Sequence, residues 1–189
     1  RPFPFYLAYT AGLLEKSGFK PLVDDAVEEN ISLERFLDET ENQQPEIIIF
    51  ETSTPTINYD LNLAKELRRR LPKLKICLAG PHATVFPKEI LTQCAPVDFI
   101  FLREYELSFT QFCEKIRDNQ PYESIAGLAF RKAAEVIINP PQPIDPLDRL
   151  PFPARHLFPS NSRPDPTLYW DGFCQYKPAV QMHATRGCP

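Results

Sequence analysis

The sequence lacks the features that mark several large classes of protein. It has no run of about 18 apolar residues, so no membrane span is predicted, and no secretory signal is visible. No serine stands in a G-x-S-x-G elbow, and neither a glycine-rich phosphate loop nor a G-x-G-x-x-G motif occurs. These absences argue against a serine hydrolase and against a dinucleotide-binding or P-loop domain.

Dense positive charge and paired cysteines are also missing. The net charge is −4, and the basic cluster Arg68, Arg69 and Arg70 falls on a predicted helix, where it would form a solvated face. We therefore expect no nucleic-acid partner. The five cysteines share no short metal-binding spacing, and Cys77 and Cys113 fall in apolar patterns. This pattern indicates reduced thiols and a cytoplasmic protein.

Proline, by contrast, is abundant and unevenly placed. Residues 1–138 hold 10 of the 21 prolines, and residues 139–189 hold the other 11. Long helices and central strands do not tolerate that density. We predict an α/β domain over residues 1–125, a β-hairpin over 126–139 and a proline-rich tail over 140–189.

Strand and helix patterns alternate within the first part. Apolar runs predict buried strands over residues 46–52, 75–80 and 97–102, with a shorter strand over 21–27. Helical periodicity predicts a helix over residues 5–17, a second helix capped by Ser32, and further helices between the strands. This alternation indicates a doubly wound, parallel α/β sheet.

One end of that pattern is unusual. The regular elements begin with a helix, whereas a doubly wound domain normally begins with a strand. We expect the first strand to be absent from the chain. The sheet would then have an unpaired edge, which is a site for homodimerisation.

Right-handed crossovers bring the carboxyl ends of the strands to one edge of such a sheet, where ligands bind. The first loop there contains Thr52, Ser53, Thr54, Pro55 and Thr56. Its hydroxyls suit a phosphate or an amide-bearing ligand, but ordinary helix capping by Thr56 or Asn58 explains them equally well.

Two further loops reach the same edge. The second contains Gly80, Pro81 and His82; glycine permits close backbone approach to a ligand, whereas a lone histidine is more often structural. The third contains Glu104, Tyr105 and Glu106 at a helix start, where the helix dipole favours acids whether or not a ligand binds.

The order of motifs resembles a known family. "YLAYTAGLLEKSGF", "TSTPT", "GPHAT", "VDFIFLREYE", "LDRLPFPARHLF" and "TRGCP" follow one another along essentially the whole chain. This series is similar to the amino-terminal half of cobalamin-dependent radical S-adenosylmethionine (SAM) enzymes, and among them to the anaerobic magnesium-protoporphyrin monomethyl ester cyclases. The combined order is specific, although no single motif is.

The resemblance implies a flavodoxin-like domain that binds cobalamin at the carboxyl edge of the sheet, with the three loops around it. It also implies that Cys188 is the first of three cysteines that hold a 4Fe–4S cluster in the parent enzyme, where the cluster cleaves SAM. One thiolate cannot hold such a cluster. We therefore expect a fragment that lacks the catalytic barrel and contains no catalytic residue of its own.

Two departures from the family weaken the cobalamin prediction. The D-x-H-x-x-G motif that supplies a lower cobalt ligand is missing, since no histidine follows Asp24 and Asp25. Relatives often carry G-E-G-E where this chain has Arg103, Glu104, Tyr105 and Glu106. An alternative is thus a domain that keeps the fold but acts as a scaffold or a substrate-gating surface.

Overall fold

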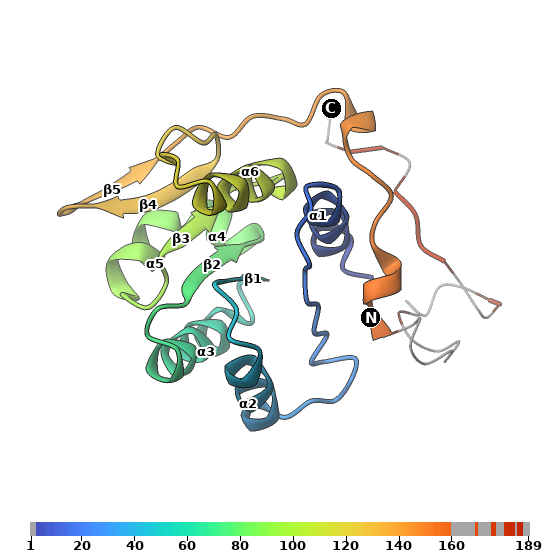
Figure 1. The fold of residues 1–189 in the computed structure, drawn as a ribbon, viewed down its shortest axis with the longest axis horizontal. Coiled ribbons are helices and arrows are strands. Elements are labelled where there is room, and N and C mark those ends of the chain that lie inside the picture. Colours follow the sequence, from blue (N-terminus) through green and yellow to red (C-terminus); the bar gives the residue numbers. More distant parts are fainter. Residues whose placement is uncertain (1–2, 160–168, 170–174, 177–179, 184, 187–189) are drawn as a thin grey trace.

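A five-stranded sheet forms the centre of the computed structural model, with its strands in sequential order (Figure 1). The structure describes residues 3–159, 169, 175–176, 180–183 and 185–186 of the 189-residue chain. Three strands run parallel: β1 (Ile47–Glu51), β2 (Lys75–Ala79) and β3 (Phe99–Phe101). A hairpin of β4 (Leu128–Lys132) and β5 (Glu135–Ile138) then adds to β3 in antiparallel orientation. The predicted α/β sheet and its hairpin are confirmed, and the hairpin continues the same sheet.

Helices cover both faces of this sheet, as a doubly wound fold requires. One face packs against α2 (Leu33–Gln43), α3 (Ile57–Arg70), α4 (Pro81–Val85) and α5 (Pro87–Gln93). The other face packs against α6 (Glu106–Arg117), which α1 (Phe5–Lys16) flanks. In β2, Ile76 and Leu78 face the first layer while Cys77 and Ala79 face the second, because successive side chains of a strand point to opposite faces.

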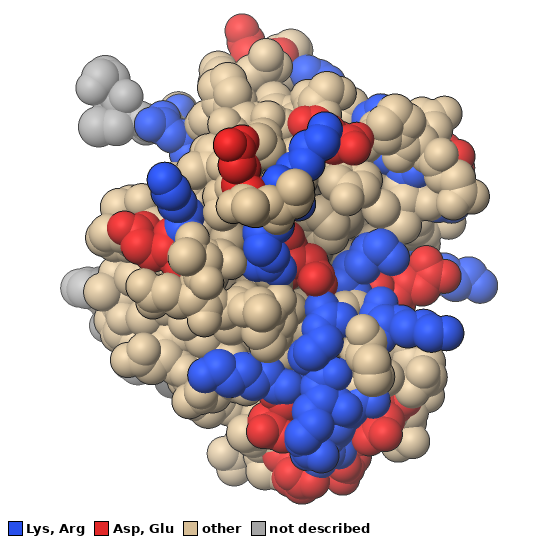
Figure 2. Space-filling view, turned by 90° about the vertical axis from the view of Figure 1, so that its left-hand side faces the viewer, with Lys and Arg blue, Asp and Glu red and all other residues tan. Residues whose placement is uncertain are grey.

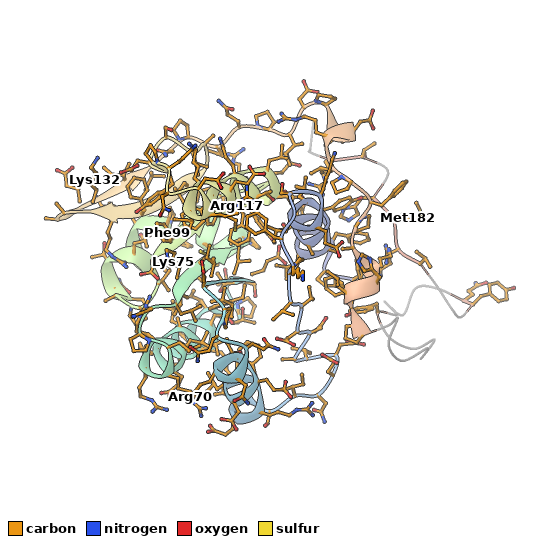
Figure 3. All side chains as sticks on the ribbon, viewed as in Figure 1. Arg70, Lys75, Phe99, Arg117, Lys132 and Met182 are labelled. Atoms are coloured by element: carbon orange, nitrogen blue, oxygen red, sulfur yellow. The ribbon has the colours of Figure 1, made fainter. Side chains whose placement is uncertain are left out.

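The ends of the first two helices follow from local sequence signals. The hydroxyl of Ser32 accepts a hydrogen bond from the Arg35 N–H group at 3.3 Å, which confirms the predicted cap of α2. Helix α1 stops before Gly18, whose φ of +81° is a conformation that glycine adopts easily. Arg117, labelled in Figure 3, links α6 to the end of α1 by donating to the Ser17 carbonyl at 3.1 Å.

The strand predicted over residues 21–27 is wrong. Residues 19–25 have no regular structure, and residues 26–30 form turns. Leu22 and Val27 are 65% and 72% exposed, so these two side chains are not covered by the sheet. The physical reason is the absence of a partner: within the described residues, β1 pairs only with β2, and the backbone of 21–27 joins no ladder.

The tail returns along α1. It contains the short 3₁₀ turns η1 (Leu147–Arg149) and η2 (Arg155–Leu157), and the Ala154 N–H group donates to the Ala8 carbonyl at 2.9 Å. Tyr169 is buried against Phe3, and its hydroxyl donates to Asp25 at 3.0 Å. These contacts hold the proline-rich segment against the amino-terminal helix.

No described helix is both long enough and apolar enough to cross a membrane. The predicted division into residues 1–125, 126–139 and 140–189 stays a prediction, although β3 and β4 join the first two parts in one sheet.

Candidate functional site

The carboxyl ends of β1, β2 and β3 bring the three predicted loops to one edge of the sheet. The second is not a loop throughout, because Pro81–Val85 form the short helix α4. The Thr52 N–H group, just past β1, donates to the Ala79 carbonyl at 2.8 Å. The Arg103 N–H group, past β3, donates to the hydroxyl of Thr84 at 2.9 Å. The three loops therefore form one connected surface, as the parallel strands predicted.

Gly80 brings the first two loops into backbone contact. Its φ of +98° and ψ of 178° lie in a region that only glycine occupies readily. A Cβ atom at this position would lie 2.6 Å from the Thr52 carbonyl oxygen, closer than two non-bonded atoms can approach. A glycine is needed here for both reasons, and it lets the backbone after β2 lie against the backbone after β1.

His82 and Thr54 form a second link between the same two loops. The Thr54 hydroxyl and His82 Nδ1 lie 3.1 Å apart, within hydrogen-bonding distance. The imidazole also lies 4.9 Å from the ring centroid of Phe86. The histidine thus has a structural partner on each side, consistent with the structural role that a lone histidine usually has.

The remaining hydroxyls of the first loop bond mainly to one another. The Ser53 N–H group donates to the Thr56 hydroxyl at 3.1 Å, and that hydroxyl donates to the Asp60 carboxylate at 2.7 Å. Thr56 occupies the N-cap position of α3, but its side chain makes no capping bond, and Asn58 lies inside the helix. Helix capping therefore explains the position of Thr56 at the start of α3. It does not explain the hydrogen bonds of the Thr56 hydroxyl, which join Ser53 and Asp60. Pro55 is exposed at the tip of this loop.

Thr52 has a buried hydroxyl without a partner. The residue is 1% exposed, and its Oγ1 atom makes no hydrogen bond to any described residue. A buried polar atom that lacks a partner costs free energy, so such atoms are rare unless a ligand or a water satisfies them. Its position between β1 and Gly80 marks the inner end of the candidate site.

Apolar side chains stand open beside these polar groups. Tyr59, Val85 and Phe86 are 57%, 66% and 40% exposed, and they lie on or next to the first two loops. Pro81 is exposed on the second loop. A large ligand with apolar faces and hydrogen-bonding side arms matches this mixture of exposed apolar surface and hydroxyl groups. The chemistry of a corrin ring and its amide arms therefore fits the residues present.

The third loop differs from the other two because its side chains turn inward. Tyr105 is 1% exposed and donates from its hydroxyl to Glu51 at 3.0 Å. Burial and the neighbouring Glu51 carboxylate raise its pKa well above the usual range, so it stays a neutral donor. Glu104 is partly exposed and accepts a hydrogen bond from the Ile144 N–H group at 3.3 Å. The third loop therefore borders this edge of the sheet with side chains that hydrogen bonds hold in place.

Glu106 is the most deeply buried acid of the described chain. It is 0% exposed at the first turn of α6, and its carboxylate pairs with the guanidinium of Arg186. Burial raises the pKa of Glu106, although the charge of Arg186 and its hydrogen bond act in the opposite direction. Arg186 also lies 3.8 Å from Glu104. No local signal in the sequence indicates this pair, because its members are 80 residues apart.

A metal site was expected only outside this domain. Among the residues that the structure describes, no three His, Cys, Asp or Glu side chains come together in a way that could hold a metal ion. Cys188 lies outside the described residues. Cys77, Cys94 and Cys113 are buried free thiols.

Together, the sheet and its connected edge define an α/β domain of the doubly wound class, with a candidate site at the carboxyl ends of its parallel strands. The family model for the B12 binding domain matches residues 2–112, which include all three loops. The chain belongs to the B12-binding domain family.

Several known proteins resemble the chain. It is 23% identical, over 98% of its length, to the cytidylyl-2-hydroxyethylphosphonate methyltransferase of Streptomyces wedmorensis, of which it covers 42%. It is 27% identical, over 90% of its length, to the anaerobic magnesium-protoporphyrin IX monomethyl ester cyclase of Synechocystis sp., of which it covers 31%. The chain thus spans less than half of each of these relatives.

A solved structure shares the fold. The cobalamin-dependent SAM radical enzyme OxsB, with aqua-cobalamin and SAM bound, superimposes with a TM-score of 0.71 at 12% identity. The match covers 82% of this chain and 22% of OxsB. At that identity the likeness shows the fold alone.

Proposed function

We propose that this chain is the cobalamin-binding module of a radical SAM enzyme of the oxidative cyclase or methyltransferase type. Membership of the B12-binding domain family supports the cofactor, and the names of the cyclase and methyltransferase relatives support the two reaction types. The observation that carries the proposal is the buried, unpartnered Thr52 hydroxyl next to Gly80, at the point where the loops meet.

The first two loops would hold the cofactor. Thr52 offers an inner hydroxyl, and the exposed Thr54 offers another once its contact with His82 is exchanged. Val85 and Phe86 offer apolar surface. When bound, cobalamin supplies a cobalt centre that carries a methyl group or assists a radical step. The protein residues bind and orient it, and they exclude water from one side.

The other loop residues have supporting roles in this proposal. Ser53 and Thr56 shape the first loop, and Pro55 and Pro81 lie exposed beside it. Of the third-loop residues, Glu104 would lie at the flank of the site, and the buried Tyr105 and Glu106 would support it from within the core.

The radical chemistry belongs to the parent enzyme. There, a 4Fe–4S cluster on Cys188 and two further cysteines would cleave SAM, and Cys188 by itself cannot hold such a cluster. We expect the chain by itself to bind corrinoid and to catalyse no radical step.

Gel filtration after incubation with hydroxocobalamin tests the proposal. We expect corrin absorbance to elute with the protein and to decrease for Gly80→Ala, with Gly18→Ala as the matched control. Gly18 also has a positive φ, but it lies outside the site, and a Cβ added there would meet no atom within 4 Å. Elution of the protein without corrin absorbance would contradict cobalamin binding.

One observation favours the alternative, a scaffold or gating domain that has lost the cofactor. Tyr105 and Glu106 turn into the core, so two of the three residues predicted in the third loop offer no side chain to a ligand. Isothermal titration with several corrinoids separates the two functions. Submicromolar binding supports the module, and no heat with any corrinoid supports the scaffold.

The proposal extends to partners and to cell compartment. Arg68, Arg69 and Arg70 all pair with acids. On the face shown in Figure 2, blue side chains gather in the lower part and red side chains lie next to them. This charge balance supports the expectation of no nucleic-acid partner. The three buried free thiols support a reducing cytoplasm.

A homodimer through the outer edge of β1 is also part of the proposal. In the described residues that edge pairs with no strand, and Ile47, Ile48 and Ile49 are only partly buried. An unpaired apolar edge favours addition of another strand. Light scattering tests this: we expect a dimer that Ile48→Lys converts to a monomer, and a monomeric wild type would contradict it.

A further inference from the structure

Described residues of the carboxyl-terminal segment contact α1 and the residues next to it. The Gln181 side chain accepts a hydrogen bond from the Phe3 N–H group at 2.9 Å, and its carbonyl accepts one from Arg155. Met182 is 78% exposed and labelled on this segment in Figure 3. The His183 ring stacks on Phe5 with centroids 3.9 Å apart. Alternate side chains therefore touch the domain.

A cavity of about 470 Å³ lies beside this segment. Its lining includes Tyr9 and Lys16 of α1 together with His183, Thr185 and Arg186. Burial and the nearby positive charge of Arg186 lower the pKa of His183, which keeps its ring neutral and suited to stacking. With an open space beneath it, the segment depends on a few specific contacts for its position.

Arg186 makes the strongest of these contacts. Its side chain is 7% exposed, and its guanidinium carbon lies 5.0 Å from the ring centroid of Tyr6 and 4.7 Å from that of Tyr9. The same guanidinium bonds to the fully buried carboxylate of Glu106. Two aromatic rings and a carboxylate therefore hold one arginine at the start of α6.

The ion pair between Arg186 and Glu106 includes two buried atoms that lack any other partner in the described part of the chain. These atoms are Arg186 Nη2 and Glu106 Oε2. If either partner is removed, the other is left as an uncompensated buried charge, which strongly favours release of the segment into water. We therefore call this contact the anchor: the segment is held at Arg186 when both partners are present and released when either is removed.

We propose that Arg186 is a positioning residue whose buried pair with Glu106 fixes the point at which the chain leaves the B12-binding domain. Arg186 precedes Cys188 by only two positions in the sequence. The anchor would thus set the distance between the carboxyl edge of the sheet and whatever Cys188 binds. Only this consequence rests on the proposed function; the anchoring does not depend on cobalamin.

Distance measurement between two spin labels tests the anchor in the complete 189-residue chain. One label goes on Cys188 and the other on a cysteine introduced by Asn62→Cys, an exposed position of α3. Cys174→Ser removes a competing thiol, and the buried Cys77, Cys94 and Cys113 stay unlabelled. Circular dichroism verifies that each variant is folded at the measuring temperature.

We expect one narrow distance distribution for the wild type and at least a twofold broader one for Arg186→Met. Glu106→Gln should broaden it similarly, and Arg186→Lys should restore part of the order because it keeps the charge. Arg69→Met is the matched control, since Arg69 is exposed and its ion pair within the described part of the chain is with Glu66. It should leave the distribution narrow.

Two results would overturn the anchor: an unchanged narrow distribution in Arg186→Met, or a wild-type distribution as broad as that of the variant. If Glu106→Gln fails to fold, the two Arg186 variants decide alone. Corrin absorbance, measured separately, reports on the proposed function. If no corrin absorbance elutes with the wild-type protein while its distance distribution is narrow, cobalamin binding is refuted and the anchor is not.

Discussion

Replacing Gly80 by alanine should separate the two loops that form the inner part of the site. The added Cβ would lie 2.6 Å from the Thr52 carbonyl oxygen and 3.0 Å from the Thr52 nitrogen. Both neighbours are backbone atoms of the residue that directly follows β1. They cannot rotate away as a side chain would, so the loops themselves must move apart.

The expected magnitude combines three effects. A residue other than glycine in this backbone region costs about 1–3 kcal/mol. Overpacking against fixed neighbours costs about 1–3 kcal/mol more, and the lower entropy of the unfolded alanine chain returns about 0.4–1 kcal/mol. We expect the free energy of unfolding to fall by about 3 kcal/mol, which lowers the melting temperature by roughly 6–12 °C for a chain of this size.

Gly18→Ala isolates the clash from the backbone strain. Gly18 has a φ of +81°, but a Cβ added to it would find no atom within 4 Å. It should lose only about 1 kcal/mol, because its strain is largely offset by the entropy effect. Urea unfolding followed by circular dichroism measures both variants. Equal stability of the two variants, or full corrinoid binding by Gly80→Ala, would refute this account of the site.

Three further predictions concern buried polar groups. Thr52→Val should stabilise the protein without ligand by about 1 kcal/mol, because it removes an unpartnered hydroxyl, and should weaken corrinoid binding about tenfold. Urea unfolding measures the stability, and titration measures the affinity. Unchanged affinity would show that the hydroxyl does not contact the ligand. Because burial raises the pKa of Glu106 above its ordinary 4.5, the native state binds that proton more tightly than the unfolded state. The wild type should therefore lose stability relative to Glu106→Gln as the pH rises from 4.5 through the native pKa, whereas a constant difference in urea unfolding would contradict the shift. Burial raises the pKa of Cys113 to about 12 and that of Cys77 well above its usual range. Neither thiol should therefore react with a disulfide reagent at about pH 8 until urea is added. Rapid labelling of either thiol in the native protein, detected by peptide mapping, would contradict this prediction.

Most of the sheet could be predicted because its signals are local. The apolar runs over residues 46–52 and 75–80 specify strands through their own side chains. The hydroxyl of Ser32 specifies the start of α2 through a bond to the nearby Arg35. Each of these signals acts within a few residues, so the sequence displays both the cause and the effect.

The strand expected over residues 21–27 failed because strands are not local. A run with strand character becomes a strand only when another segment supplies hydrogen-bond partners. The described structure supplies none to this run, and Val23 instead packs near Phe3 and Phe5. Sequence pattern reveals which side chains prefer a strand, but not whether a partner strand lies within reach.

The sequence by itself therefore determined the α/β class, the three parallel strands and the edge where the segments 52–56, 80–86 and 103–106 meet. Those properties follow from periodicity and from the rule that parallel strands share their carboxyl edge. Only the tertiary structure decided that Thr52 keeps an unpartnered hydroxyl, that Tyr105 turns inward, and that Glu106 pairs with Arg186. Burial and charge pairing depend on which distant segments pack together, and no spacing within the sequence records that packing.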